Sequence, residues 1–214
     1  TPTVDKQRAT LVSNISGETI QNLPTSRDIG TIFNIVPGVT GDTVHGSSVR
    51  DNTYNVDGVN VTDPVIGSQA GSLSLDIVEE MSVQTGSLTA EHGGVRGAVV
   101  NVVTKSGGNR FSGSASFYFR NKDMQSDNTD GTIFEGQEVG FDFESEPSFT
   151  LGGPVIKDKL WFFTSFNMRK SEEYAFGYPW DTQPTNTPLD YNRYMLYGKL
   201  SLQLGVDDKM TFSY

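Results

Sequence analysis

The 214-residue sequence predicts a small mixed α/β domain over residues 1–107, followed by antiparallel β-strands over residues 108–214. Two observations carry this prediction. Residues 1–107 contain short apolar runs, turn residues and brief stretches of helical spacing, whereas the chain from about residue 110 alternates aromatic and polar side chains with strand periodicity. The chain has no run of about 18 apolar residues, so no transmembrane helix is predicted, but the strands of a β-barrel would escape that criterion.

Strand signals in residues 1–107 fall in four segments. Residues 12–15, 77–83 and 98–103 are of strand length, and the last is almost wholly apolar, which is typical of a central strand. Residues 54–61 alternate around Asp57 and Gly58, and an Asp-Gly pair in that setting indicates a hairpin turn or bulge. A functional role for the Asp57 carboxylate is the alternative interpretation.

Two short helices are predicted after the first strand. Ser16 can cap a helix that continues to Leu23 and stops at Pro24. Residues 25–28 (Thr-Ser-Arg-Asp) resemble a capping box, which would begin a second helix at its threonine. A Pro-Gly pair at residues 37–38 would end this helix. Its apolar residues lie at helical spacing: Ile29, Ile32, Phe33 and Val36.

Five strands are predicted in residues 108–214. In the most regular one, leucines occupy one face and polar side chains such as Lys199 and Ser201 occupy the other. The second strand is the shortest and follows Pro147. The five segments are residues 111–119, 148–151, 160–168, 194–204 and 210–214.

The connections between these strands alternate in length. Residues 121–146 and 169–190 form long loops, whereas residues 153–159 and 206–208 form short turns. Long loops at one edge and short turns at the other are typical of outer-membrane β-barrels. A soluble up-and-down sheet with a covered edge is the alternative interpretation of the same pattern.

Composition argues against several classes of protein. The chain has no cysteine, and its two histidines, His45 and His92, offer few ligands for a transition metal. A net charge of -10 argues against a general nucleic-acid binder, which would need a basic face. No catalytic motif is present, and the glycine-rich residues 93–97 precede a strand, whereas a phosphate cradle needs a helix. The sequence therefore predicts neither an enzyme nor a bound cofactor.

Acidic residues concentrate in the first long loop. Residues 121–146 contain Lys122 and eight carboxylates. The simplest interpretation is a solvated loop. A calcium site is the alternative, since hard cations bind carboxylate oxygens, and Asp127 and Asp130 are the ligands that it would use. The spacing of acids around them does not match an EF-hand loop.

Several segments resemble, in order along the chain, the TonB-dependent outer-membrane transporters. Residues 22–28 (NLPTSRD), 36–39 (VPGV), 55–61 (NVDGVNV) and 90–109 (AEHGGVRGAVVNVVTKSGGN) are similar to the plug domain of that family. Residues 152–163 (GGPVIKDKLWFF) resemble the second barrel hairpin of its Oar-like subgroup. The matches extend over nearly the whole chain.

The resemblance implies that residues 1–107 are a plug domain seated inside a barrel of about 22 antiparallel strands, of which residues 108–214 supply the first five. The protein would lie in the outer membrane of a Gram-negative bacterium, against lipid and lipopolysaccharide. It would bind an extracellular ligand and import it while the plug gates the lumen. Energy would come from the TonB–ExbB–ExbD complex, although residues 1–10 show no clear TonB box. A structural or adhesive barrel without an import role is the alternative.

Five strands cannot close a barrel, so we expect the chain to be the front part of a longer protein. The family also orients the strands, with both long loops outside the cell. The residues of the fourth strand that would then face lipid are Leu196, Leu200, Leu202 and Leu204. Those that would face the plug are Tyr197, Lys199 and Gln203.

Plug domains of the family contact ligand partly through their outward loop tips. These correspond by position to residues 49–53 and 63–66. Exposed turns without a binding role are the alternative interpretation. The substrate-binding residues that the resemblance implies are Arg50, Asp51, Asn52 and Asp63.

Overall fold

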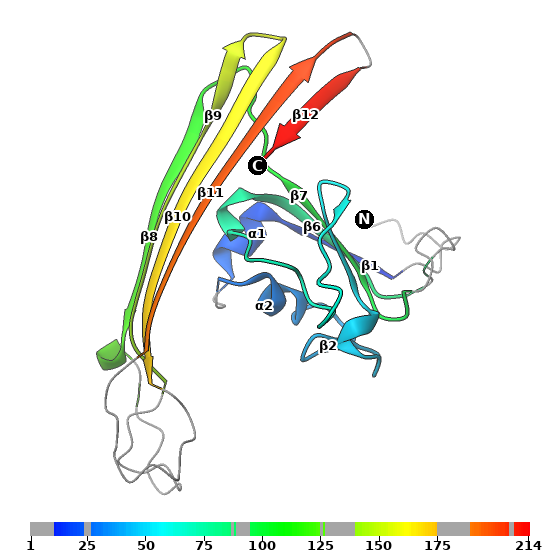
Figure 1. Cartoon of the computed structure of the whole chain (residues 1–214), viewed down its shortest axis with the longest axis vertical. Helices are drawn as coiled ribbons and strands as arrows, with labels where there is room; N and C mark the ends of the chain where they lie inside the picture. The colour runs from blue at the N-terminus through cyan, green and yellow to red at the C-terminus, as the bar shows by residue number, and fades with distance from the viewer. Residues whose placement is uncertain are drawn as a thin grey trace, which may run out of the picture. The chain divides into compact units, whose positions relative to one another are not determined.

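A computed structural model divides the chain into two compact units, Thr1–Lys105 and Ser106–Tyr214. Each unit is built on a sheet of its own (Figure 1). No helix in the described part of the chain is long and apolar enough to cross a membrane. The structure describes residues 11–23, 27–86, 88, 95–124, 126, 140–174, 189–205 and 208–214.

The first unit contains a five-stranded mixed sheet in the order β1-β6-β7-β4-β5. Strands β4 and β7 are parallel, and the other neighbours are antiparallel. The nearly all-apolar segment at residues 98–103 forms β7, which has the central position that its composition predicts. The strands are β1 (Val12–Ser16), β4 (Thr53–Val56), β5 (Val59–Asn60), β6 (Val78–Gln84) and β7 (Val99–Thr104), and a separate hairpin pairs β2 (Val39–Thr40) with β3 (Thr43–Val44).

Helix α1 (Gly17–Asn22) begins where the sequence predicts. The Ser16 hydroxyl accepts a hydrogen bond from the backbone N–H of Thr19 at 3.2 Å and so caps the helix. The helix ends one residue before the predicted Leu23, which is its C-cap.

Helix α2 (Ile29–Phe33) begins later than the sequence predicts. Its N-cap is Asp28, because that carboxylate reaches the backbone N–H of Gly30 at 2.7 Å. The capping box predicted at Thr25 is therefore wrong in register, and Thr25 itself lies outside the described residues. All four apolar residues predicted for this segment are buried: Ile29, Ile32, Phe33 and Val36.

A hydrophobic core forms where both helices meet the sheet. Ile20 of α1 and Phe33 of α2 belong to one buried cluster with Met81 of β6 and Val100 of β7. The Phe33 ring meets the Tyr54 ring edge-on, with 6.1 Å between the ring centroids. The first unit therefore has a core made from its own residues. The first unit also contains two 3-10 helices, η1 (Val49–Asp51) and η2 (Leu75–Ile77).

The predicted hairpin around Asp57 and Gly58 joins β4 to β5. Both residues have positive φ angles, 48° and 82°, as a type I′ hairpin turn requires. The Asp57 carboxylate accepts hydrogen bonds from the backbone N–H of Thr104 at 2.9 Å and from its hydroxyl at 2.5 Å. This carboxylate therefore fixes the turn to the end of β7.

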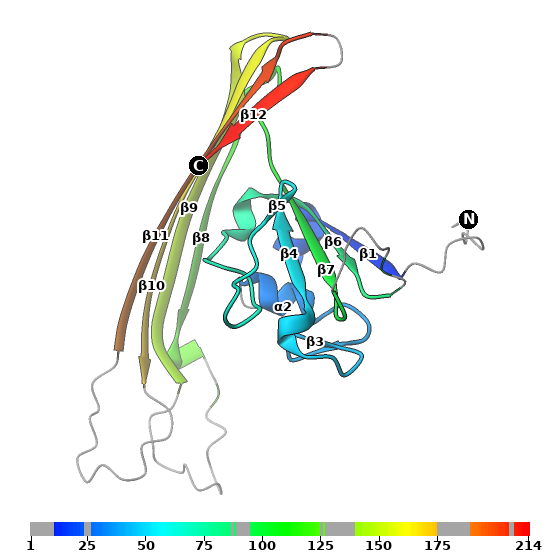
Figure 2. The ribbon, with the colours of Figure 1, turned by 45° about the vertical axis from the view of Figure 1, so that its right-hand side comes forward.

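The second unit contains an antiparallel sheet in the order β12-β11-β10-β9-β8. Its four longer strands lie side by side and curve gently along their length (Figures 1 and 2). A short 3-10 helix, η4 (Lys122–Met124), follows the first strand. The strands are β8 (Ser112–Asn121), β9 (Gly140–Ile156), β10 (Leu160–Tyr174), β11 (Leu189–Gln203) and β12 (Lys209–Ser213).

Several predicted boundaries in this unit are wrong because the strands extend into the predicted connections. Strand β9 includes residues 140–146 of the predicted acidic loop and residues 153–156 of the predicted turn. Strands β10 and β11 likewise take residues 169–174 and 189–190 from the second predicted loop. Acidic residues are depleted in strands, so Asp and Glu concealed the start of β9.

The two faces of this sheet differ in polarity. On one, which we call the apolar face, cross-strand partners form the row Ala115, Phe149, Phe166 and Leu196, and Leu200 lies between Phe162 and Phe212. On the other, the polar face, the corresponding row is Ser116, Ser148, Asn167 and Met195. Leu202 lies on the apolar face, and Tyr197, Lys199 and Gln203 on the polar face, whereas Leu204 follows the end of β11.

Candidate functional site

The two loops that the sequence predicts to contact ligand pack together beside the start of β4. An ideal Cβ placed on Gly67 would lie 2.3 Å from the Cα of Arg50, far inside van der Waals contact. Gly67 also has a φ of 76°, which residues with side chains rarely adopt. Glycine at this position therefore allows the loop that begins at Asp63 to touch η1.

Asp51 and Asn52 use their side chains to shape the first of these loops. The Asp51 carboxylate accepts a hydrogen bond from the backbone N–H of Ser48 at 2.9 Å and completes a capping box around η1. Asn52 is 3% exposed; its Nδ2 donates to the Asp42 carbonyl at 2.7 Å, and its Oδ1 accepts from the Ala98 N–H at 2.9 Å. Both side chains thus bind backbone.

Arg50 and Asp63 are more accessible than Asn52. The Arg50 side chain is exposed and Asp63 is half-buried. The Asp63 carboxylate accepts hydrogen bonds from the backbone N–H groups of Val65 at 2.7 Å and Ile66 at 3.0 Å. These two bonds lower the pKa of Asp63, so its carboxylate is charged at neutral pH. The paired loop tips therefore present a guanidinium and a carboxylate.

A cavity of about 200 Å³ lies within the same unit. Burial and the nearby Asp42 charge raise the pKa of Tyr54, which lines the cavity, to about 12, so its phenol stays neutral. Carboxylate, hydroxyl and amide side chains line the cavity together with Tyr54, so it can form hydrogen bonds with a small polar molecule. Its lining consists of Asp28, Ile29, Gly30, Asp42, Tyr54, Ser68, Gln69, Gly71, Ser72 and Leu73.

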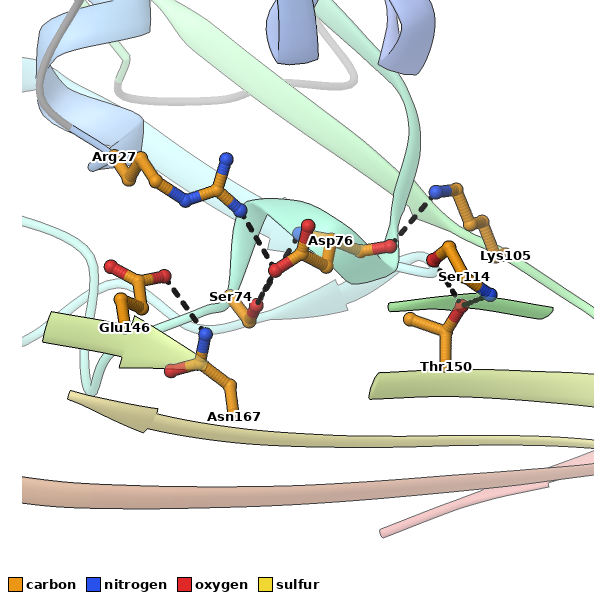
Figure 3. Close-up of polar contacts among 8 residues, drawn as sticks. All are labelled: Arg27, Ser74, Asp76, Lys105, Ser114, Glu146, Thr150 and Asn167. Carbon is orange, nitrogen blue, oxygen red and sulfur yellow. Dashed lines mark hydrogen bonds and ion pairs between the residues drawn. The ribbon is translucent and has the colours of Figure 1, made fainter. Parts of the chain in front are cut away.

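Asp76 is a buried carboxylate that no sequence pattern predicts. It lies in η2, is 4% exposed, and pairs with the Arg27 guanidinium at 2.7 Å (Figure 3). The Ser74 hydroxyl donates to the same carboxylate at 3.3 Å, and Lys105 Nζ donates to the Asp76 carbonyl at 2.9 Å. Asp76 therefore joins three segments of the first unit. No local pattern marks its burial, because its charged partners Arg27 and Lys105 are distant in the sequence.

Charged side chains gather on the polar face of the second unit, where β8 ends and β9 begins. Glu144 of β9 pairs with Arg120 of β8 and with Arg169 of β10, the latter at 2.7 Å. Two residues further along β9, Glu146 accepts a hydrogen bond from Asn167 Nδ2 at 2.8 Å (Figure 3). These two carboxylates, predicted in an external loop, instead bind side chains of neighbouring strands.

The calcium ligands suggested by the sequence, Asp127 and Asp130, lie outside the described residues. Within the ranges that the structure describes, no group of three or more acidic, histidine or cysteine side chains is arranged to hold a metal ion.

The first strands of the sheet with one apolar and one polar face are similar to a known class of domain. A model of the outer membrane beta barrel domain matches residues 103–188. The chain is 33% identical over 186 residues to the TonB-dependent transporter Oar of Myxococcus xanthus, covering 77% of this chain and 17% of Oar. It is 26% identical over 187 residues to a probable TonB-dependent siderophore receptor, PirA, of Acinetobacter baumannii, covering 75% of this chain and 23% of that relative.

Solved structures share the fold. The siderophore receptor PirA from Acinetobacter baumannii superposes with a TM-score of 0.71 at 22% identity, covering 94% of this chain and 30% of that one. The siderophore receptor PirA from Pseudomonas aeruginosa superposes with a TM-score of 0.69 at 24% identity, covering 94% of this chain and 32% of that one.

The chain is therefore homologous to the TonB-dependent outer-membrane receptors, and the family resemblance seen in its motifs is confirmed. Its place is the outer membrane of a Gram-negative bacterium. The chain spans less than a quarter of the length of these two curated relatives.

Proposed function

We propose that the chain supplies the plug domain, residues 1–107, and the first barrel strands, residues 108–214, of a transporter that imports an extracellular ligand. The observation that carries the proposal is a unit with its own core followed by a two-faced antiparallel sheet, in a homologue of a TonB-dependent transporter. The apolar face would contact lipid and lipopolysaccharide, because membrane strands direct their apolar side chains outward. The polar face would line the lumen.

In this proposal the first unit closes the lumen until the TonB–ExbB–ExbD complex acts on it. The loop tips carry the ligand contacts. Arg50 and Asp63 are the accessible charges there, while Asp51 and Asn52 hold the backbone that presents them. Alanine at Arg50 and Asp63 together should weaken ligand binding by the full-length protein, and unchanged affinity would overturn the assignment of these two residues.

Uptake by whole cells tests the transport function and does not require the ligand to be identified first. Cells that carry the full-length gene, cells that lack it, and cells without functional TonB are grown in the same medium. We expect at least one compound to be depleted from the medium only when the receptor and TonB are both present. Equal depletion by all three strains would overturn import and favour a structural or adhesive role.

A disulfide across the first sheet tests gating directly. Asn55 of β4 and Asn101 of β7 are register partners, and their side chains hydrogen-bond at 2.9 Å. Neighbouring strands lie about 4.8 Å apart, which suits a disulfide, and the chain has no cysteine of its own. Oxidised Asn55→Cys/Asn101→Cys protein should lose uptake and regain it with dithiothreitol, whereas each single variant should transport normally. Normal uptake by the cross-linked protein would show that this sheet need not open.

A further inference from the structure

Only Ser106 separates the residue that is fastened to the first unit from the segment that is fastened to the second. Lys105 belongs to the first unit: its backbone N–H donates to the Ile77 carbonyl at 2.7 Å, and its Nζ donates to the Asp76 carbonyl at 2.9 Å. Gly107 is packed within the second unit. Ser106 is exposed and has no hydrogen bond to the described residues. The backbone angles of the chain can therefore change most easily at Ser106.

Residues 107–111 pack tightly on the β9–β10 hairpin. An ideal Cβ on Gly107 would lie 3.0 Å from the carbonyl oxygen of Gly153 and still closer to that of Phe162, so only glycine fits here. An ideal Cβ on Gly153 would in turn meet the Phe111 ring. The centroid of that ring lies 6.3 Å from the centroid of the Phe162 ring. Both ends of the segment are thus in contact with the hairpin.

Asn109 fastens the middle of the segment by hydrogen bonds. The Asp158 N–H and the Trp161 indole N–H donate to its Oδ1 at 2.9 Å and 2.7 Å, and its Nδ2 donates to the Asp158 carboxylate. Asp158 lies in the turn between β9 and β10, and Trp161 lies near the start of β10. A single bond of this kind contributes little. Three bonds to one side chain, together with the packing of Gly107, hold the segment at several points.

We propose that residues 107–111, which we call the anchor, stay fastened to the β9–β10 hairpin during transport, so that the moving part of the chain ends at Ser106. The inference rests on the proposed function, in which the TonB–ExbB–ExbD complex acts on the first unit. If the anchor came loose, it and Ser106 could extend to about 20 Å, since an extended chain spans about 3.3–3.6 Å per residue. That slack would let the first unit shift as a body. A fixed anchor instead makes the strands of the first unit take up the movement.

Two glycine variants of the full-length protein test the anchor. The readout is the TonB-dependent depletion of compounds from the growth medium by whole cells. Gly107→Ala should slow depletion by about twofold or more, because its methyl group would clash with the Phe162 backbone and loosen the anchor. Gly108→Ala is the matched control: its ideal Cβ has no heavy atom within 4 Å, so depletion should proceed at the wild-type rate. The fraction of each variant that migrates as folded barrel before heating separates a loosened anchor from failed assembly.

A disulfide within the anchor should act in the opposite direction to the one across the first sheet. Reduced Asn109→Cys/Asp158→Cys protein lacks the hydrogen bonds of Asn109 and should deplete the medium slowly. The two side chains are in contact, so oxidation can join them, and the locked anchor should restore the wild-type rate. Oxidised Asn55→Cys/Asn101→Cys protein should instead lose uptake.

Two results would overturn the anchor. Loss of uptake on oxidation of Asn109→Cys/Asp158→Cys would show that the segment has to release. Wild-type rates in both Gly107→Ala and the reduced cysteine pair would show that fastening it contributes nothing.

The anchor and the transport function can fail separately. Absence of TonB-dependent depletion by the wild type would overturn transport but not the fastening, which amide hydrogen exchange measures without uptake. The Asp158 amide donates to Asn109, so its exchange should be clearly faster in Gly107→Ala than in Gly108→Ala. Equal exchange rates in the two variants would overturn the fastening alone.

Discussion

Asn109 and Asp158 bind each other through two hydrogen bonds although 49 residues separate them. Asn109 Nδ2 donates to Asp158 Oδ1 at 2.5 Å, and the Asp158 N–H donates to Asn109 Oδ1 at 2.9 Å. The Trp161 indole N–H donates to the same Asn109 oxygen at 2.7 Å. Asp158 has a φ of 60°, so it forms the left-handed corner of the β9–β10 turn. The segment before β8 is thereby fastened to the next hairpin.

Asn109→Ala should destabilise the second unit. The change removes three hydrogen bonds and leaves the Trp161 N–H without its acceptor, which should lower the free energy of unfolding by about 1–3 kcal/mol. The measurement is the urea midpoint of the full-length protein in detergent. Asn192→Ala is a suitable control, because Asn192 is exposed on β11 and has no side-chain hydrogen bond to the described residues. Equal midpoints for both variants would mean that the Asn109 contacts contribute nothing.

Gly67→Ala should separate the two candidate ligand loops. The added methyl group would clash with the Arg50 backbone, and the φ of 76° adds strain. We therefore expect the free energy of unfolding to fall by more than about 2 kcal/mol. Gly71→Ala provides a matched control, since Gly71 has a φ of 75° but no heavy atom within 4 Å of its ideal Cβ. The free energy of unfolding of that variant should fall by about 1 kcal/mol, from backbone strain alone. Limited proteolysis of the loops should rank Gly67→Ala as clearly the more sensitive, and equal sensitivity would contradict the close packing.

Local chemistry predicts much of the first unit. Ser16 caps α1 because a hydroxyl at that position can reach an unpaired N–H of the first turn. Asp57 and Gly58 form a hairpin because both tolerate a positive φ. In each case the determining contact lies within a few residues of the signal, so the sequence pattern contains the information that decides the structure.

Features that depend on contacts between residues far apart in the sequence were not predicted. The start of β9 carries acidic residues that disfavour a strand, and Arg120 and Arg169 neutralise one of them only after the sheet has formed. The buried Asp76 is acceptable because Arg27 reaches it from another segment. For the candidate site, the family resemblance suggested Arg50 and Asp63, but the contact between their loops depends on Gly67.

Asp76→Ala should be among the most damaging single changes in the first unit. The Arg27 side chain is 12% exposed, so its guanidinium would lose the Asp76 carboxylate in a largely buried position, and breaking such a pair lowers the free energy of unfolding by about 3–5 kcal/mol. The double variant Arg27→Met/Asp76→Leu should recover most of the stability, because apolar pairs of similar size often replace a buried ion pair without loss. The rate of amide hydrogen exchange in β6 and β7 of the full-length protein measures the stability of the single and the double variant. Faster exchange in the double variant than in the single one would contradict this account of the ion pair.

Leu200→Lys should hinder assembly of the barrel. Leu200 lies on the apolar face between Phe162 and Phe212, and a lysine on the lipid side near the membrane midplane destabilises a barrel by about 2–4 kcal/mol. Met195→Lys places the same charge on the polar face of the same strand, where lumen-side polarity tolerates it. The fraction of full-length protein that migrates as folded barrel before heating should therefore fall for Leu200→Lys and stay near the wild-type value for Met195→Lys. The reverse order would show that the apolar face is not the one in contact with lipid.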